Sequence, residues 1–304
     1  MTILERIGFI GLGVMGNLMC HRLLLLNRPV VVYDLNQQAV DLMVEAGAQA
    51  SNSPAEVAAQ SEIMLASLPN ESVVEAVVFG ENGLLKGIKP GDVFVDLSSS
   101  TPAMTKRAGQ ALSAKGAEML DAPVSRGASA AMEGTLSIMV GGKPETLERC
   151  RYILEQLGTD IIHIGELGAA HTIKSLNNLL SATNLITAIE GTIIAARAGV
   201  DPNKFIAAIN AGSGRSHMTT NRFPKYYLPR KFESNFALGL MYKDISIALE
   251  LAKQLGTPML FSNITQHVYA IAMSRGMGGE DNTKIMLLLE ELMNCNIADD
   301  SRKS

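Results

Sequence analysis

RIGFIGLGVMG, residues 6–16, is the stretch that decides the fold. Its apolar run Ile7–Ile10 predicts a short buried strand, and Gly11, Gly13 and Gly16 follow where a helical pattern begins. Glycines in this spacing allow a tight turn, close approach of the backbone to a pyrophosphate, and close packing of the helix on the strand. The N–H groups at the start of such a helix hold phosphates without a cationic side chain. The stretch therefore predicts a dinucleotide-binding turn.

An acidic residue stands where such a site needs one. A second predicted strand, Val30–Tyr33, is followed by Asp34, roughly 20 residues after Gly16. A carboxylate there accepts hydrogen bonds from the ribose hydroxyls and repels a 2′-phosphate, so we expect NAD as the cofactor, with NADP less favoured. Arg28 is close in sequence but lies on the wrong side of the strand to hold a phosphate. The alternative is a glycine-rich turn with Asp34 as an ordinary strand-end cap.

Short apolar runs alternate with helical patterns over the first half of the chain, which is typical of a parallel sheet covered by helices. Ser53-Pro54 and Thr101-Pro102 each place a capping residue before a proline at the first helical position. Gly47 is expected to end an earlier helix. The predicted strands are Ile7–Ile10, Val30–Tyr33, Ile63–Ser67, Val93–Leu97, Glu118–Asp121, Ser137–Val140 and Ile161–Ile164.

The pattern changes near Gly165. Residues Ala169–Ala198 stay apolar or small without a proline, which predicts one helix of about 45 Å that leaves the first domain and forms the spine of a second. We predict an α/β Rossmann domain with a doubly wound, mostly parallel sheet at residues 1–166, an all-α domain at 167–295, and a frayed tail at 296–304. Further helices are expected at Pro202–Asn210, Gly239–Leu255, Pro258–Arg275 and Asn282–Asn294, with an irregular stretch at Ser213–Lys231.

Charge and cysteine usage restrict the class of protein. The 304 residues carry a formal net charge of −4 without a basic tract, so we expect no nucleic-acid partner. Cys20, Cys150 and Cys295 lie far apart without metal-ligand spacing, and we expect reduced thiols that fill the core. The five histidines show no HxxxH or HExxH pairing, so no metal site is expected.

The chain runs directly into strand-forming sequence at Arg6, which leaves no room for a signal peptide. No uninterrupted apolar run reaches the ~18 residues of a membrane span. These features predict a cytoplasmic protein with no membrane partner.

Two later loops extend the predicted cofactor site. Leu68-Pro69-Asn70 and the stretch 98–101 each follow a predicted strand, and the carboxyl ends of strands in a doubly wound sheet face the cofactor. Together with the glycine turn, the predicted cofactor-binding residues are Gly11, Leu12, Gly13, Val14, Met15, Gly16, Asp34, Leu68, Pro69 and Ser99.

Three segments together resemble the β-hydroxyacid dehydrogenase family, which includes 3-hydroxyisobutyrate dehydrogenases and tartronate semialdehyde reductases. The first is GFIGLGVMG at residues 8–16. The second, DAPVSRGASAAMEGTLSIMVGG at 121–142, is similar to the family's substrate loop, and the third, GELGAAHTIKSLNNLL at 165–180, to its catalytic helix. Lys243-Asp244 matches a lysine–aspartate pair late in the helical domain. These motifs are ordered and spread over nearly the whole chain, so the resemblance is specific.

The resemblance implies a nicotinamide-dependent dehydrogenase that interconverts a small acidic alcohol and its aldehyde. It makes Lys174 the general acid in reduction and the general base in oxidation, with Asn178 orienting both Lys174 and the substrate. Lys243 would close over the nicotinamide and joins the cofactor-binding set; the alternative is a solvated helix charge. The substrate-binding residues that the resemblance implies are Ser125, Arg126, Gly127 and Asn177.

The sequence around Lys174 supports a proton-transfer role. Lys174 and Asn178 are one helical turn apart, so their side chains are neighbours. Apolar residues flank Lys174, so we expect its ammonium to be partly desolvated, which favours release of a proton. The alternative is a structural lysine that reaches from an apolar helix into solvent.

The chain departs from the family at one position. The family's substrate loop usually continues Ser-Gly-Gly, whereas Ser125-Arg126-Gly127 stands here. This arginine, with the stretch His217-Met218-Thr219-Thr220, resembles the 3-sulfolactaldehyde reductases of the family. We expect the guanidinium to bind a sulfonate, a phosphonate or a second carboxylate of the substrate, the alternative being an arginine turned to solvent.

The candidate substrates are therefore 3-sulfolactaldehyde, tartronate semialdehyde and 3-hydroxyisobutyrate. Competing interpretations are a non-catalytic, regulatory NAD-binding protein, which the presence of Lys174 and Asn178 disfavours, and an imine reductase, a group that generally lacks the lysine. The 6-phosphogluconate dehydrogenases share motifs but have a considerably longer helical domain. The weakly charged second domain predicts burial against another subunit, and the family resemblance implies a homodimer or homotetramer.

Overall fold

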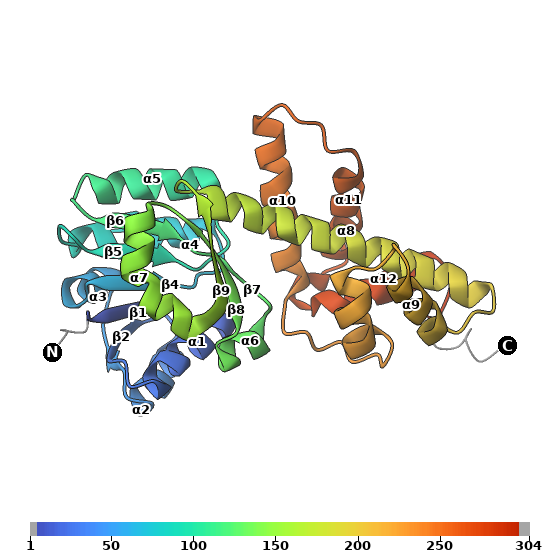
Figure 1. Ribbon diagram of the computed structural model, residues 1–304, viewed down its shortest axis with the longest axis horizontal. Coiled ribbons are helices and arrows are strands. Elements are labelled where there is room, and N and C mark those ends of the chain that lie inside the picture. The colour runs from blue at the N-terminus through green and yellow to red at the C-terminus, as the bar shows by residue number, and fades with distance from the viewer. Residues whose placement is uncertain (1–4, 298–304) are drawn as a thin grey trace. The chain divides into compact units, whose positions relative to one another are not determined.

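The computed structural model describes residues 5–297, shown in Figure 1. They form two compact units, the first reaching to Lys174 and the second beginning at Ser175. The division falls inside the long helix α8 (Ala169–Arg197), whereas the sequence places the domain boundary just before that helix. Lys174 is thus assigned to the unit that carries the glycine turn.

The first unit is built on one sheet whose strands run in the order β3-β2-β1-β4-β5-β6-β8-β7, with β9 paired to β8. All pairings from β3 to β6 are parallel, while β8 runs antiparallel to both β6 and β7. The Rossmann fold and the mostly parallel sheet are confirmed. The strands are β1 (Ile7–Ile10), β2 (Val30–Tyr33), β3 (Gln49–Ala50), β4 (Ile63–Ala66), β5 (Val93–Asp96), β6 (Glu118–Asp121), β7 (Val124–Ser125), β8 (Leu136–Gly141) and β9 (Gly158–Gly165).

The carboxyl ends of the central strands lie level with one another. Ile10 pairs with both Tyr33 and Ala66, Ala66 pairs with Asp96, and Asp96 pairs with Asp121. The loops after β1, β2, β4, β5 and β6 therefore leave the sheet along one edge. Strand order reverses between β1 and β4, and ligands of doubly wound sheets bind at such a switch point.

Apolar side chains cover both faces of this sheet, as expected for parallel strands buried on both sides. Phe9 and Leu65 belong to one core cluster, and Ile10 and Met64, their chain neighbours, to the other. The first cluster is shared with α1 (Val14–Leu25), α2 (Gln37–Glu45), α6 (Ala128–Glu133) and α7 (Pro144–Leu157). The second is shared with α3 (Pro54–Gln60), α4 (Glu71–Phe79), η1 (Leu84–Lys86) and α5 (Pro102–Ser113).

The predicted helix boundaries are confirmed where capping residues mark them. The Ser53 hydroxyl accepts a hydrogen bond from the backbone N–H of Glu56, and the Thr101 hydroxyl accepts one from Met104. Gly47 follows the end of α2 with φ +103°, a conformation that favours glycine.

The second unit is entirely helical and packs its own core. It contains most of α8, then α9 (Pro202–Ala211), η2 (Met218–Tyr227), α10 (Leu238–Gln254), α11 (Leu260–Ser274), η3 (Met277–Gly279), η4 (Asn282–Lys284) and α12 (Ile285–Leu292). The stretch predicted as irregular contains η2, which is a π-helix. The predicted fraying from residue 296 onward is wrong at Ile297, which is buried and donates its N–H to the Glu290 carboxylate. Residues 298–304 lie outside the part of the chain that the structure describes.

Helix α8 is long enough to cross a membrane, and its mean hydropathy over an 18-residue window is high enough as well. It contains no uninterrupted apolar run of that length. Half of that window is buried within the protein. The core helix of a globular domain passes the same test of length and composition, so α8 is weak evidence for a span.

Candidate active site

The glycine turn between β1 and α1 has two tightly packed glycines and one open one. A Cβ on Gly16 would lie 1.9 Å from the carbonyl oxygen of Gly11, and one on Gly11 would lie 2.4 Å from that of Ser67. A Cβ on Gly13 would meet no atom within 4 Å. Gly13 caps α1, whose first turn contains no acidic residue. Open space in front of unopposed helix N–H groups fits a pyrophosphate.

This difference predicts opposite behaviour for two alanine substitutions. Gly13 has φ −65°, which alanine adopts freely, so Gly13→Ala should fold with an unchanged Tm. Its methyl group would occupy the phosphate path and weaken NADH binding by at least ~10-fold, about 1.4 kcal/mol. Gly16→Ala should instead lower Tm because its methyl group meets backbone. Thermal melts and NADH fluorescence titrations measure both; equal NADH affinity of Gly13→Ala and the unmodified protein would contradict the assignment.

The Asp34 carboxylate is fixed at the end of β2. One of its oxygens accepts the N–H of Leu12 at 2.6 Å and the other the N–H of Asn36 at 2.7 Å. The residues that follow, Leu-Asn-Gln-Gln at 35–38, bring no cation to this place. Arg28 turns elsewhere, towards Gln156 and the ring of Tyr152. A carboxylate without a nearby cation disfavours a 2′-phosphate.

The loops after β4 and β5 are joined to each other. The N–H of Leu68 donates to the Ser98 hydroxyl at 2.9 Å, and the N–H of Ser98 donates to the buried carboxylate of Asp96 at 3.0 Å. Pro69 is exposed and Ser99 half-buried. These predicted cofactor residues therefore lie on the same edge of the sheet as the glycine turn.

The predicted substrate loop begins in β7, whose residue Ser125 pairs with Ser137 of β8. Arg126 follows with φ +89°, and Gly127 with φ +80°. The Arg126 guanidinium forms an ion pair with Asp160 and donates to the Thr135 carbonyl at 3.0 Å and the Thr159 hydroxyl at 3.2 Å. The arginine is thus neither turned freely to solvent nor unpaired.

Helix α8 starts at the end of β6. The buried carboxylate of Asp121 accepts the N–H groups of Gly168 and His171, both at 2.8 Å. Lys174 lies three residues further along α8 and is half-buried, as the apolar sequence around it predicts. The edge that carries the glycine turn is therefore also the edge from which the helix of Lys174 begins.

In the second unit, Asp244 of α10 organises two predicted site residues. Its buried carboxylate accepts the side-chain amide of Asn178 at 2.5 Å and lies 3.2 Å from the Lys243 ammonium. The Asn178 oxygen accepts the side-chain amide of Asn177 at 3.1 Å. These contacts fix which end of the Asn178 amide is the acceptor.

Comparison with known proteins agrees with both units. Residues 6–165 match the NAD binding domain of 6-phosphogluconate dehydrogenase, and residues 168–289 match the NAD-binding model of NADP-dependent 3-hydroxyisobutyrate dehydrogenase. The chain is 34% identical over 293 residues to 2-(hydroxymethyl)glutarate dehydrogenase of Eubacterium barkeri, which covers 96% of this chain and 97% of the relative. The chain belongs to the β-hydroxyacid dehydrogenase family.

Further relatives agree with this family membership. 3-Sulfolactaldehyde reductase of Escherichia coli K12 is 33% identical over 282 residues, covering 92% of this chain and 94% of that protein. The structure of Mycobacterium tuberculosis 3-hydroxyisobutyrate dehydrogenase with L-serine has a TM-score of 0.87 at 26% identity, covering 94% and 99% of the two chains. An imine reductase of Myxococcus stipitatus, 16% identical with a TM-score of 0.64, shares the fold alone. The protein is an oxidoreductase with a nicotinamide cofactor.

Sequence reasoning missed several residues that hold the site of this dehydrogenase together. Asp121, Asp160 and Asp244 each support a predicted site residue or its helix from a distant part of the chain. Asp121 and Asp244 belong to the quoted motifs, and each is an acidic residue in an apolar strand or helix, which is a sequence signal that could have identified them. No such sequence signal distinguishes Asp160.

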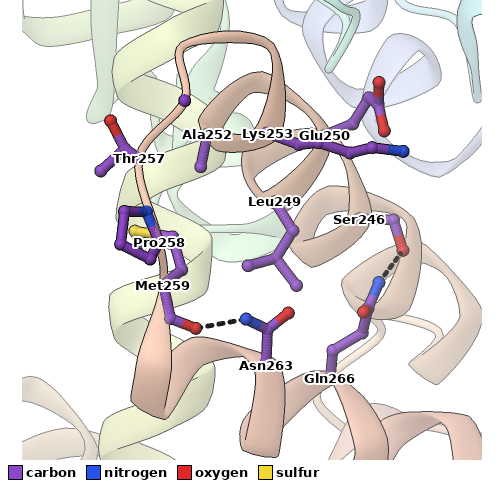
Figure 2. A pocket seen from close by; sticks show the side chains of 11 residues that line it. Ser246, Leu249, Glu250, Ala252, Lys253, Thr257, Pro258, Met259, Asn263 and Gln266 are labelled. Carbon is purple, nitrogen blue, oxygen red and sulfur yellow. Dashed lines mark hydrogen bonds between the residues drawn. The ribbon is translucent and has the colours of Figure 1, made fainter.

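A hollow of about 700 Å³ between α10 and α11 is separate from these residues (Figure 2). Its polar side chains bond to their neighbours: Asn263 donates to the Met259 carbonyl, and Gln266 donates to the Ser246 hydroxyl at 3.0 Å. Cys20 and Cys150 are buried, which raises the pKa of each thiol to about 12, as expected for core filler. Neither feature adds to the active site.

Proposed function

We propose that this dehydrogenase uses NAD to interconvert a short β-hydroxyacid, or another anionic primary alcohol, and its semialdehyde, and that its preferred substrates carry a sulfonate or a second carboxylate. Lys174 serves as general acid and base. The observation that carries the proposal is the start of α8 on the edge of the glycine turn, which assigns Lys174 to the cofactor-binding unit.

The chemistry divides between cofactor and protein. A nicotinamide cofactor, when bound, would supply the hydride chemistry. Lys174 takes the hydroxyl proton in oxidation and returns it to the carbonyl oxygen in reduction. Asn178, held by Asp244, presents its amide oxygen in a defined direction, and Ser125 donates a hydrogen bond to the substrate. Lys243, paired with Asp244, completes the proposed set of cofactor-binding residues.

The names of two relatives support a sulfonate or a second carboxylate on the substrate. 2-(Hydroxymethyl)glutarate, named in one, carries two carboxylates, and 3-sulfolactaldehyde, named in the other, carries a sulfonate. Arg126, in a loop of the substrate segment, is the side chain suited to such an anion. We also propose a cytoplasmic enzyme that assembles as a homodimer or homotetramer.

A steady-state panel with both cofactors tests the proposal. The panel contains 3-sulfolactaldehyde, which carries a sulfonate, 2-(hydroxymethyl)glutarate, which carries two carboxylates, and, as comparisons with one carboxylate, tartronate semialdehyde and 3-hydroxyisobutyrate. The sulfonate and the dicarboxylate should have the higher kcat/KM. If 3-hydroxyisobutyrate is the best substrate, neither a sulfonate nor a second carboxylate is recognised, and if no substrate turns over, a regulatory NAD-binding protein or an imine reductase is the better interpretation.

The same panel measures cofactor preference. Because the Asp34 carboxylate would repel a 2′-phosphate in the proposed site, NADH should exceed NADPH by at least ~10-fold in kcat/KM, about 1.4 kcal/mol. Asp34→Ser should narrow that ratio without changing the substrate order. Equal or better turnover of the unmodified enzyme with NADPH would show that Asp34 does not select the cofactor.

A further inference from the structure

The first turn of α8 is capped by a residue from another element. Gly168 and His171 have N–H groups at the helix start, where no intrahelical acceptor is available. Asp121, at the end of β6, accepts both with its two carboxylate oxygens, each at 2.8 Å. Its side chain is fully buried, and a negative charge at a helix N-terminus is favourable. The helix start is thereby fixed to the end of a central strand.

The imidazole of His171 makes two further connections from the same turn. Its Nε2 lies 3.1 Å from the carbonyl oxygen of Ser98 in the loop after β5. Its Nδ1 lies 2.7 Å from the hydroxyl of Thr105 on α5. The ring is fully buried, so both contacts exclude water. Ser98 also accepts the N–H of Leu68, which extends the connection to the loop after β4.

These contacts fix the orientation of the His171 ring. A carbonyl oxygen only accepts, so Nε2 carries a proton and donates it to Ser98. The Thr105 hydroxyl lies within hydrogen-bond distance of both Nδ1 and the Thr101 carbonyl oxygen, the latter at 3.0 Å. Both ring nitrogens therefore have a partner, and the ring has one orientation.

Lys174 lies three residues after His171, so the two side chains are neighbours on the helix surface. We propose that Asp121 and His171 are positioning residues, a clamp that holds the first turn of α8 against the ends of β5 and β6 and so aims Lys174 at the cofactor-side loops. The inference rests on the proposed role of Lys174. Misplacement of a reacting group by about 1 Å can cost 10²-fold in rate, so such a clamp matters.

A double-mutant cycle tests whether His171 acts through Lys174. His171→Leu preserves the size of the side chain and removes both hydrogen bonds, so kcat should fall roughly 10–100-fold while KM for NADH stays nearly constant. In the Lys174→Ala background, the same change should alter the residual kcat by less than about 2-fold. His171→Gln, whose amide can still donate to Ser98, should restore most of the rate. Equal losses in both backgrounds, or an unchanged kcat, would overturn the proposal.

Thr105→Val provides a milder variant if His171→Leu fails to fold. It removes the hydroxyl that bonds Nδ1 and the Thr101 carbonyl of its own helix, and kcat should fall about 3–10-fold, again only while Lys174 is present. Thr192→Val is the matched control, because Thr192 is a fully buried threonine of α8 whose hydroxyl bonds only the Ala188 carbonyl within the helix. It should leave kcat unchanged; an equal loss in both variants would contradict a specific role for Thr105.

Amide hydrogen exchange tests the clamp without any turnover. Asp121→Asn should speed exchange at Gly168 and His171 by about 10-fold or more, because the charged acceptor of both N–H groups is lost. Exchange in α10 should not change. Unaltered exchange at α8 would overturn the clamp. The activity of Lys174→Ala separates the two hypotheses. If Lys174→Ala is fully active, the proposed role of Lys174 is wrong, and the clamp then has no part in catalysis even where exchange at α8 is faster in Asp121→Asn.

Discussion

Replacing Lys174 with alanine should lower kcat by roughly 10²–10⁴, the usual contribution of general acid–base catalysis. Without the amine, the hydroxyl proton must pass to or from water while the hydride moves. NADH binding should be nearly unchanged, because we assign the pyrophosphate to the glycine turn and the ribose to Asp34 rather than to this side chain. Stopped-flow turnover and NADH fluorescence titration measure the two effects separately.

A second lysine supplies the control for this substitution. Lys253 lies exposed on α10, and Lys253→Ala removes the same charge and the same length of side chain outside the predicted site. It should leave kcat and KM unchanged. Lys174→Ala with normal kcat would remove Lys174 from the mechanism, and loss of NADH binding together with activity would indicate a structural lysine.

Replacing Arg126 with glycine should raise KM for a sulfonate or dicarboxylate substrate by about 10–100-fold, or 1.5–3 kcal/mol, the usual value of a hydrogen bond to a charged group. The guanidinium is held by Asp160, but both side chains are 47% exposed. An exposed ion pair of this kind contributes only about 0–1 kcal/mol, so a substrate anion can replace Asp160 at little cost. KM for 3-hydroxyisobutyrate, whose only anion is one carboxylate, should stay constant.

The partner of Arg126 offers a test in the opposite direction. Asp160→Asn keeps the shape of the side chain and removes its charge, which releases the guanidinium for the substrate. KM for 3-sulfolactaldehyde should fall by about 2–5-fold, the equivalent of the exposed ion pair that is lost. Initial-rate measurements on both substrates decide the question. If Arg126→Gly shifts both KM values alike, the side chain does not select the substrate.

The sequence predicted the fold wherever a segment had a strong local pattern. The long strands and the proline-capped helices α3 and α5 are formed by residues whose preferences agree with their surroundings. β3 and β7 were missed because two residues cannot show a period of two. The π-helix η2 was not predicted, because Pro224 and the polar residues around it are typical of a loop. Burial of Phe223 and Tyr227 holds the segment in place.

The site divides in the same way. The glycine turn, Asp34 and Lys174 could be found because each stands in a fixed spacing next to a recognisable strand or helix. The partners of these residues could not, because contacts such as that of Asp121 with His171 join positions far apart in the chain. The pairing of Arg126 with Asp160 depends on the register between β8 and β9, which no local pattern encodes.

The backbone of Arg126 has a consequence for protein engineering. Its φ of +89° is strained for any residue with a side chain, at a cost of about 1–3 kcal/mol that glycine would not incur. A laboratory evolution campaign that selects only for heat resistance should therefore enrich glycine at position 126. If the guanidinium binds the substrate, the selected variants would be more thermostable but less selective for their substrate. A useful library must therefore be screened for thermostability and substrate selectivity at once.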